Sequence, residues 1–129
     1  MGLDRINEIS VLGLAHVGDA VYELLVRSML CLDGKKKAND LHKRTVSIVN
    51  APAQAQAAQR LIPYLTDEEL TVYKRARNSK VNSVPHSADI AQYHAATGLE
   101  ALLGWLYLQG RTERVSELFE ICAEGFYGT

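Results

Sequence analysis

Two carboxylates, Asp19 and Glu100, stand in stretches of sequence that are otherwise strongly apolar, residues 14–24 and 97–108. An ionised carboxylate is costly to bury unless it is paired, hydrogen-bonded or bound to a cation. Hard divalent cations such as Mg²⁺ prefer oxygen ligands. The two acids are therefore a candidate metal site, although an ordinary salt bridge or exposure to solvent would also explain each of them.

Small residues flank both acids and would let two helices approach closely enough for both carboxylates to reach one cation. These residues are Gly18, Ala20, Gly98, Ala101 and Gly104. Glu23 lies one helical turn after Asp19 and competes for the same role, but a structural ion pair is the favoured interpretation of it. The histidines, His16, His42, His86 and His94, show no metal-ligand spacing, and no Ser-His-Asp or Cys-His arrangement is visible.

The elements that must position these acids are expected to be helices, in one all-α domain over residues 1–129. Apolar residues recur at helical spacing, and no stretch alternates between apolar and polar residues as a strand does. The expected helices span residues 10–32, 39–50, 52–61, 66–77 and 87–110, followed by a last helix that ends near residue 124. Residues suited to cap them stand near these limits: Ser10, Asn39, Thr66 with Glu69, Ser87 and Gly110. Residues 78–87 are polar and are expected to form a loop.

Composition and charge narrow the class of protein. The chain has 129 residues, 47% of them hydrophobic and 22% charged, which is typical of a compact domain. Residues 35–86 hold ten of the fourteen Lys and Arg, whereas both flanking segments are acidic. This pattern favours a surface that faces a polyanion, with scattered solvated charge as the plain alternative. Two cysteines, no signal-peptide pattern and no apolar run near 20 residues predict a cytoplasmic protein without a membrane segment.

Several segments resemble the ribonuclease III family. Residues 17–24 (Val-Gly-Asp-Ala-Val-Tyr-Glu-Leu) are similar to its signature helix, and residues 99–108 to its second acidic helix. Residues 40–44 and 75–80 resemble the reduced branch of the family, Mini-ribonuclease III. The resemblance runs over nearly the whole chain. It implies a ribonuclease III-type catalytic domain, a two-fold homodimer that cuts double-stranded RNA with Mg²⁺ in the maturation of large-subunit (23S) ribosomal RNA. The larger relatives append a double-stranded-RNA-binding domain, which is not expected here.

The sequence also departs from the family pattern. The larger relatives carry further carboxylates one turn before each matched acid, where this chain has Ala15 and Thr97. The hypothesis is that Asp19 and Glu100 are the catalytic residues and hold one hydrated Mg²⁺, for which Mn²⁺ is a substitute, with Thr97 at most orienting a water. His16 stands where the signature is usually aromatic. Cleavage by a metal-activated water would leave 5′-phosphate and 3′-hydroxyl ends.

Residues expected to bind RNA are basic or polar and lie in the middle of the chain. They are Lys35, Lys36, Lys37, Lys43, Arg44, Lys74, Arg75, Arg77, Asn78, Lys80 and His86. The loop at 78–87 is predicted to enter a groove of the duplex. Other expected partners are a second copy of the chain, held through Val17, Val21 and Leu24, and a ribosomal-protein helper. Two alternatives remain at this point: a non-catalytic helical module that binds ribosomal RNA, and a helical oligomerisation domain.

Overall fold

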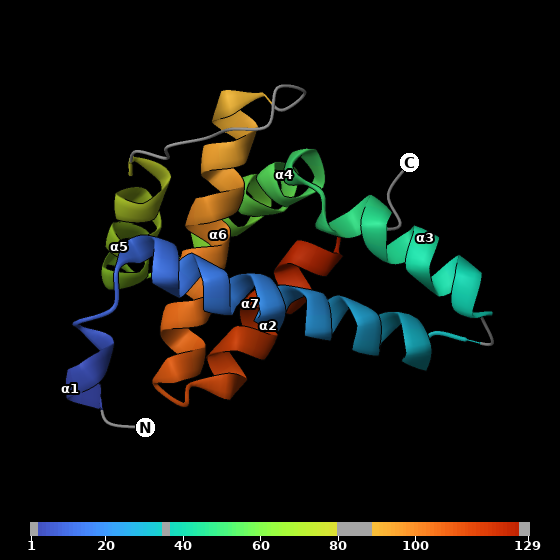
Figure 1. Ribbon diagram of the computed structural model, residues 1–129, viewed down its shortest axis with the longest axis horizontal. Coiled ribbons are helices and arrows are strands. Elements are labelled where there is room, and N and C mark those ends of the chain that lie inside the picture. The colour runs from blue at the N-terminus through green and yellow to red at the C-terminus, as the bar shows by residue number, and fades with distance from the viewer. Residues whose placement is uncertain (1–2, 35–36, 80–88, 127–129) are drawn as a thin grey trace.

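The computed structural model describes residues 3–34, 37–79 and 89–126, and within these ranges the backbone is helical almost throughout, with no strand (Figure 1). The elements are α1 (Leu3–Ile6), α2 (Val11–Leu32), α3 (Ala38–Val49), α4 (Ala51–Leu61), the 3₁₀ turn η1 (Ile62–Tyr64), α5 (Asp67–Arg77), α6 (Ile90–Leu108) and α7 (Thr112–Ala123). The prediction of an all-α fold is confirmed. None of the described helices is both long and apolar enough to span a membrane.

Helix α6 is the centre of the fold. The long helix α2 crosses it, α4 and α5 pack against it, and α3 lies beside the C-terminal half of α2 (Figure 1). The side chains of Leu99, Leu102, Leu103 and Leu106 on α6 are completely buried. Because leucines point to several sides of this helix, it is apolar nearly all round, which is the pattern of a helix enclosed by others.

Two glycines let α2 and α6 cross with their backbones in contact. A Cβ atom on Gly18 would collide with the backbone carbonyl of Glu100, and one on Gly104 would collide with a backbone carbonyl of α2. The predicted close approach through small residues is confirmed at these two positions. Gly98 serves another contact: a Cβ there would lie 2.7 Å from the ring of Tyr73 on α5.

The start of α2 and the start of α5 follow their predicted caps. The Ser10 side chain accepts a hydrogen bond from the backbone N–H of Gly13 at 3.0 Å. Thr66 and Glu69 form the full capping box, in which each side chain accepts from the other residue's backbone N–H. These local signals fix helix limits because they satisfy backbone donors that have no partner inside the helix.

Two other predicted helix starts are wrong. Helix α3 begins at Ala38, so Asn39 lies inside the helix, and Lys37 stands at the N-cap position without a side-chain cap bond. Helix α6 begins at Ile90, where the Asp89 carboxylate accepts from a backbone N–H and replaces the predicted cap Ser87. Ser87 itself lies outside the described residues.

One buried ion pair ties α5 to α7. Glu69 is completely buried, and both of its carboxylate oxygens accept hydrogen bonds from Arg114 at 2.8 Å. Arg114 also donates to the backbone carbonyl of Tyr64 at 2.9 Å. Hydrogen bonding to Arg114 holds the pKa of the Glu69 carboxyl below its usual range, so the pair is ionised at neutral pH.

Candidate active site

The contact between Gly18 and Glu100 brings the two predicted acids together. Asp19 is the next residue after Gly18, and its side chain is hydrogen-bonded to the carboxyl group of Glu100. Asp19 is exposed on α2, whereas Glu100 is half-buried on α6. Residues 81 positions apart in the chain therefore form one carboxylate pair at the helix crossing.

The carboxylate pair resists holding two negative charges. Burial raises the pKa of Glu100 to about 8, and the hydrogen bond and the negative charge of Asp19 act in the same direction. Glu100 therefore keeps its proton at neutral pH unless a cation takes its place. A divalent cation coordinated by oxygen atoms would neutralise both groups, so the donor set fits Mg²⁺ or Mn²⁺.

Two further polar side chains stand behind Glu100. The amide of Gln54, on α4, lies near enough to the Glu100 carboxyl to lower its pKa. The Tyr22 phenol is completely buried on α2, and burial, with small effects from Cys122 and Glu100, raises its pKa above the ordinary range. The Gln54 Nε2 and Tyr22 Oη atoms are both buried without a hydrogen-bond partner among the described residues.

The carboxylate pair is a sparse set of ligands. Within the described ranges, no group of three or more His, Cys, Asp and Glu residues could hold a metal ion. Ala15 is buried beside the crossing and adds no ligand. The Thr97 hydroxyl, also buried, donates to the backbone carbonyl of Tyr93 at 3.0 Å, so only its oxygen lone pairs are left for another partner. Any bound cation would keep several of its waters.

Glu23 forms an ion pair, which is the role that the sequence favoured for it. Its carboxylate lies 2.7 Å from the Arg27 guanidinium, one turn along α2. Asp19, Glu23 and Arg27 line one open surface pocket together with His16. The Arg27 side chain therefore places a positive charge, paired with Glu23, in the same pocket as Asp19.

The remaining histidines do not assemble a site. His16 on α2 and His42 on α3 are exposed, and they belong to different surface pockets. His94 is half-buried on α6, with its ring edge-on to Tyr93. His86 lies outside the described residues.

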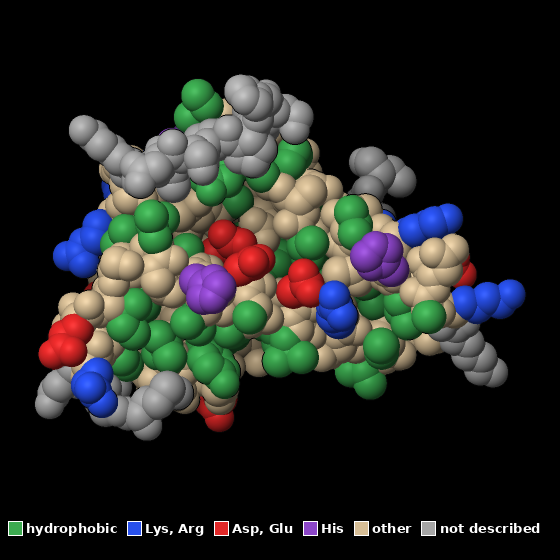
Figure 2. Space-filling model, viewed as in Figure 1, with side chains coloured by type: hydrophobic (Ala, Val, Ile, Leu, Met, Phe, Trp, Pro, Cys, Tyr) green, Lys and Arg blue, Asp and Glu red, His purple; other side chains and the backbone are tan. Residues whose placement is uncertain are grey.

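Positive charge gathers on both sides of an acidic centre. Figure 2 shows acidic side chains near the middle of one face, where α2 crosses α6, and Lys and Arg toward its two ends. At one end Lys37 and Lys43 are exposed on and before α3, and at the other Lys74 and Arg75 are exposed on α5. Because α3 and α5 lie at opposite ends of α2, these predicted RNA-binding residues fall into two groups (Figure 1).

Other predicted RNA-binding residues are partly engaged within the chain. Arg44 is half-buried, and its guanidinium donates to the backbone carbonyl of Phe126 at 2.5 Å. Arg77 lies 5.7 Å from the centre of the Tyr73 ring and donates to the Asn78 side chain at 3.3 Å. Asn78 ends α5 and is exposed. Lys35, Lys36, Lys80 and His86 lie outside the described residues.

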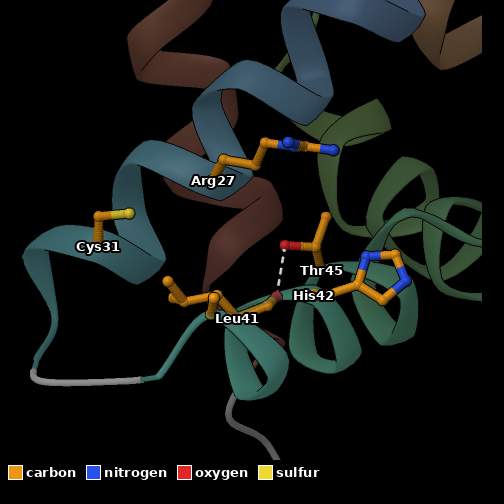
Figure 3. Close-up of a pocket in the computed structure, with 6 residues that line it drawn as sticks. Arg27, Cys31, Leu41, His42 and Thr45 are labelled. Atoms are coloured by element: carbon orange, nitrogen blue, oxygen red, sulfur yellow. Dashed lines mark hydrogen bonds between the residues drawn. The ribbon is translucent and has the colours of Figure 1, made fainter.

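A second pocket lies between the end of α2 and the start of α3 (Figure 3). It is lined by Arg27, Cys31, Leu41, His42 and Thr45, and the Thr45 hydroxyl donates to the Leu41 carbonyl at 2.8 Å. Arg27 also lines the pocket beside the carboxylate pair. The two pockets therefore share one residue, Arg27, and the pocket next to α3 also contains the imidazole of His42.

An apolar surface groove lies where α2, α6 and α7 meet. It is lined by His16, Val17, Ala20, Leu24, Tyr107 and Val115, among other residues. The Leu24 side chain is 63% exposed and Tyr107 is 42% exposed. Large apolar side chains so exposed in one groove are typical of an interface with another molecule.

Comparisons with known proteins define the class. The model of the ribonuclease III domain matches residues 12–111, which contain both acids of the pair. The chain therefore belongs to the ribonuclease III family of endoribonucleases. Within that family it belongs with the Mini-ribonuclease III proteins. It is 47% identical to Mini-ribonuclease 3 of Symbiobacterium thermophilum over 113 residues, covering 88% of this chain and 87% of the relative.

More distant relatives agree. The chain is 35% identical to Mini-ribonuclease 3 of Streptococcus pneumoniae over 125 residues, which cover 95% of this chain and 98% of the relative. A crystal structure of a protein from Fusobacterium nucleatum matches with a TM-score of 0.83 and 33% identity, covering 94% of this chain and 97% of that one. The fold and the family assignment thus rest on nearly the full length of the chain.

Gln54 and Tyr22 were not among the residues predicted from the sequence. Both lie inside helices whose apolar faces suggested ordinary core positions. For Gln54 a weak signal was present: it is the one amide on the buried face of an alanine-rich helix, where Gln56 and Gln59 are exposed. Only the packing of α4 against α6 shows that this amide faces an acid.

Proposed function

We propose that this chain is a Mg²⁺-dependent endoribonuclease that cleaves double-stranded RNA, with Asp19 and Glu100 as its catalytic residues and metal ligands. The observation that carries the proposal is the contact of two carboxylates from distant helices at a glycine-lined crossing, in a chain of the ribonuclease III family. Burial and Asp19 raise the pKa of Glu100, so this pair of acids does not stabilise the fold as an ion pair would. A bound cation would explain why the two acids lie together.

A bound Mg²⁺ would activate and orient the attacking water and neutralise the charge that develops on the phosphate. Asp19 and Glu100 would contribute to the reaction by binding this cation. Glu100 would bind the cation as a carboxylate, without the proton that it keeps at neutral pH in the metal-free chain, and Asp19 would supply the second carboxylate. Arg27, beside the pair, supplies a positive charge for the RNA backbone. Attack of water on the phosphorus would leave 5′-phosphate and 3′-hydroxyl ends.

The duplex would lie across the acidic centre with its phosphates on the cations of α3 and α5. Because A-form RNA offers its backbone and 2′-hydroxyls rather than its bases, separate groups of exposed cations suit it better than one deep groove. Replacing Lys74 and Arg75 with Ala should weaken duplex binding for all sequences alike. It should also flatten the dependence of log Kd on log salt by roughly one unit for each phosphate that the protein no longer neutralises. An unchanged salt dependence in a filter-binding titration would exclude α5 from the interface.

We propose further that the apolar groove around Leu24 and Tyr107 is the interface of a two-fold homodimer. One site cuts one strand, and a two-fold dimer presents two sites to the two strands of a duplex. The exposure of Leu24 and Tyr107 in a groove beside the carboxylate pair supports this arrangement. The biological substrate that the family resemblance implies is precursor 23S ribosomal RNA in the cytoplasm, presented with the help of a ribosomal protein.

The decisive test is incubation of the purified protein with long duplex RNA and Mg²⁺. Wild type should release fragments with 5′-phosphate ends, and Asp19→Ala should not, whereas Glu120→Gln, an exposed acid on α7, should cleave as wild type does. In heavy-oxygen water the label should enter the 5′-phosphate. A 2′,3′-cyclic product would refute the hydrolytic mechanism. Duplex binding without cleavage by wild type would support the alternative, a non-catalytic ribosomal-RNA-binding module.

A further inference from the structure

Gln54 is a buried amide with an unsatisfied donor. It lies on α4, is only 2% exposed, and its Nε2 has no hydrogen-bond partner among the described residues. A buried donor without a partner destabilises the folded chain, so an apolar residue would be the expected occupant of this position. Its neighbours on the buried face of α4, Ala57 and Ala58, are apolar, so the amide is an exception that calls for a specific partner.

That partner is Glu100. Helix α4 packs directly on α6, and the Gln54 side chain lies near enough to the Glu100 carboxyl to lower its pKa. Asp19 approaches the same carboxyl from α2. Glu100 therefore has two polar neighbours, an exposed acid from α2 and a buried amide from α4.

We propose that Gln54 is a positioning residue for the metal site, which donates a hydrogen bond from its amide to the ionised Glu100 carboxylate and fixes that carboxylate for cation binding. The inference rests on the proposed function, because it assumes that Asp19 and Glu100 bind a divalent cation. Groups that hydrogen-bond a metal ligand from behind restrict its rotation, and their loss typically weakens metal binding by roughly 10- to 100-fold. The effect should be large here, since only two carboxylates hold the cation.

Tyr22 is the other buried polar group near Glu100, but it is less suited to this role. Its ring packs edge-on against Phe119 and Phe126, with centroids 5.9 and 6.4 Å away. Its packing alone explains why an aromatic residue occupies the position. Gln54 has no such explanation, and its exposed neighbour Gln56, on the same helix, supplies a matched control.

The experiment measures Mn²⁺ binding to the RNA-free protein, by the loss of free-ion signal in electron paramagnetic resonance. Gln54→Met, which keeps the length of the side chain without its donor, should raise the Mn²⁺ Kd by roughly 10-fold or more, and Gln56→Met should leave it unchanged. Asp19→Ala should abolish binding. If Gln54→Met binds Mn²⁺ within about twofold of wild type, the positioning role is refuted. If Asp19→Ala also binds as wild type does, the metal site of the proposed function has failed instead.

Stability and cleavage measurements separate positioning from folding. Without metal, Gln54→Met should melt at the same temperature as wild type or higher, because a buried unpaired donor has been removed. Gln54→Leu is a second variant for the case in which Met packs poorly, and it should show the same Mn²⁺ defect. In cleavage assays, the Mg²⁺ concentration for half-maximal rate should rise in both variants, and the rate should recover at saturating Mg²⁺. A rate loss that no Mg²⁺ concentration restores would contradict the proposal.

Discussion

Glu100→Gln, which replaces the acid with a neutral side chain of the same shape, should make the metal-free protein more stable. This gain in stability should increase as pH rises above the ordinary pKa of a glutamate. The pKa of Glu100 is about 8 in the folded chain against an ordinary value of 4.5, because of burial and the neighbouring Asp19. Below pH 4.5 the group is protonated in both the folded and the unfolded chain, so it costs nothing. Between pH 4.5 and 8 the unfolded chain releases this proton and the folded chain keeps it, so stability falls as pH rises.

The magnitude follows from the same two values. The slope is at most about 1.4 kcal/mol per pH unit, which gives a cost of about 3 kcal/mol at pH 7 as an upper limit, since the folded chain can relax. Glu100→Gln removes this cost. The variant should therefore exceed wild type in unfolding free energy by up to about 3 kcal/mol at pH 7, and the difference should shrink to nearly nothing at about pH 4.5.

The assay is urea unfolding in a chelator, followed by circular dichroism at pH 4.5, 6 and 7.5. Asp19→Asn is the internal comparison: it removes the negative charge that helps to raise the Glu100 pKa, so it should recover part of the same stability. Added Mg²⁺ at pH 7.5 should stabilise wild type and leave Glu100→Gln unaffected. If Glu100→Gln is no more stable than wild type at pH 7.5, burial and Asp19 do not raise the pKa of Glu100, and the account of the site is wrong.

Three further changes test the fold around the site. Gly18→Ala should lower stability by about 1–3 kcal/mol and abolish cleavage, because its Cβ collides with a backbone carbonyl, whereas Gly34→Ala, in open space, should do neither. Thermal melts and cleavage rates measure both. Arg114→Met should cost about 3–5 kcal/mol by stranding the buried Glu69 carboxylate, and the loss should diminish as acid protonates that group. Leu24→Asp should convert a dimer to monomers in analytical ultracentrifugation; an unchanged mass would place the interface elsewhere.

Local signals in the sequence were sufficient for much of the fold. Ser10 and the Thr66 capping box marked helix starts because each satisfies backbone donors within three residues. Asn39 misled because a good capping side chain does not decide where a helix begins when the preceding residue already adopts helical geometry. Ser87 was predicted as the N-cap of α6, but Asp89 occupies that position. Both side chains can cap a helix, and the sequence alone does not decide between them.

The two acids of the candidate site could be predicted from the sequence, but the polar residue that packs beside them could not. Acids and small residues on two apolar segments indicated that Asp19 and Glu100 could meet, because small residues let two helices approach closely, although a salt bridge or exposure to solvent was an open alternative for each acid. Gln54 could not be placed beside them, because its approach depends on how α4 packs on α6, which is a contact between distant segments. The same limit holds for Glu69, whose partner Arg114 lies 45 residues away.

The candidate site lies at the crossing of α2 and α6, where the backbones leave no room for larger side chains. Gly18 and Gly104 bring the backbones into contact, and buried leucines on α6 fix that contact on the far side. A site on such rigid elements holds its ligands precisely, which a sparse ligand set requires. The same rigidity keeps Asp19 beside the half-buried Glu100, so Glu100 stays protonated at neutral pH until a cation binds. Metal-free stability and cation affinity are therefore opposed in this pair of side chains. A substitution that makes the metal-free protein more stable should weaken its binding of the cation.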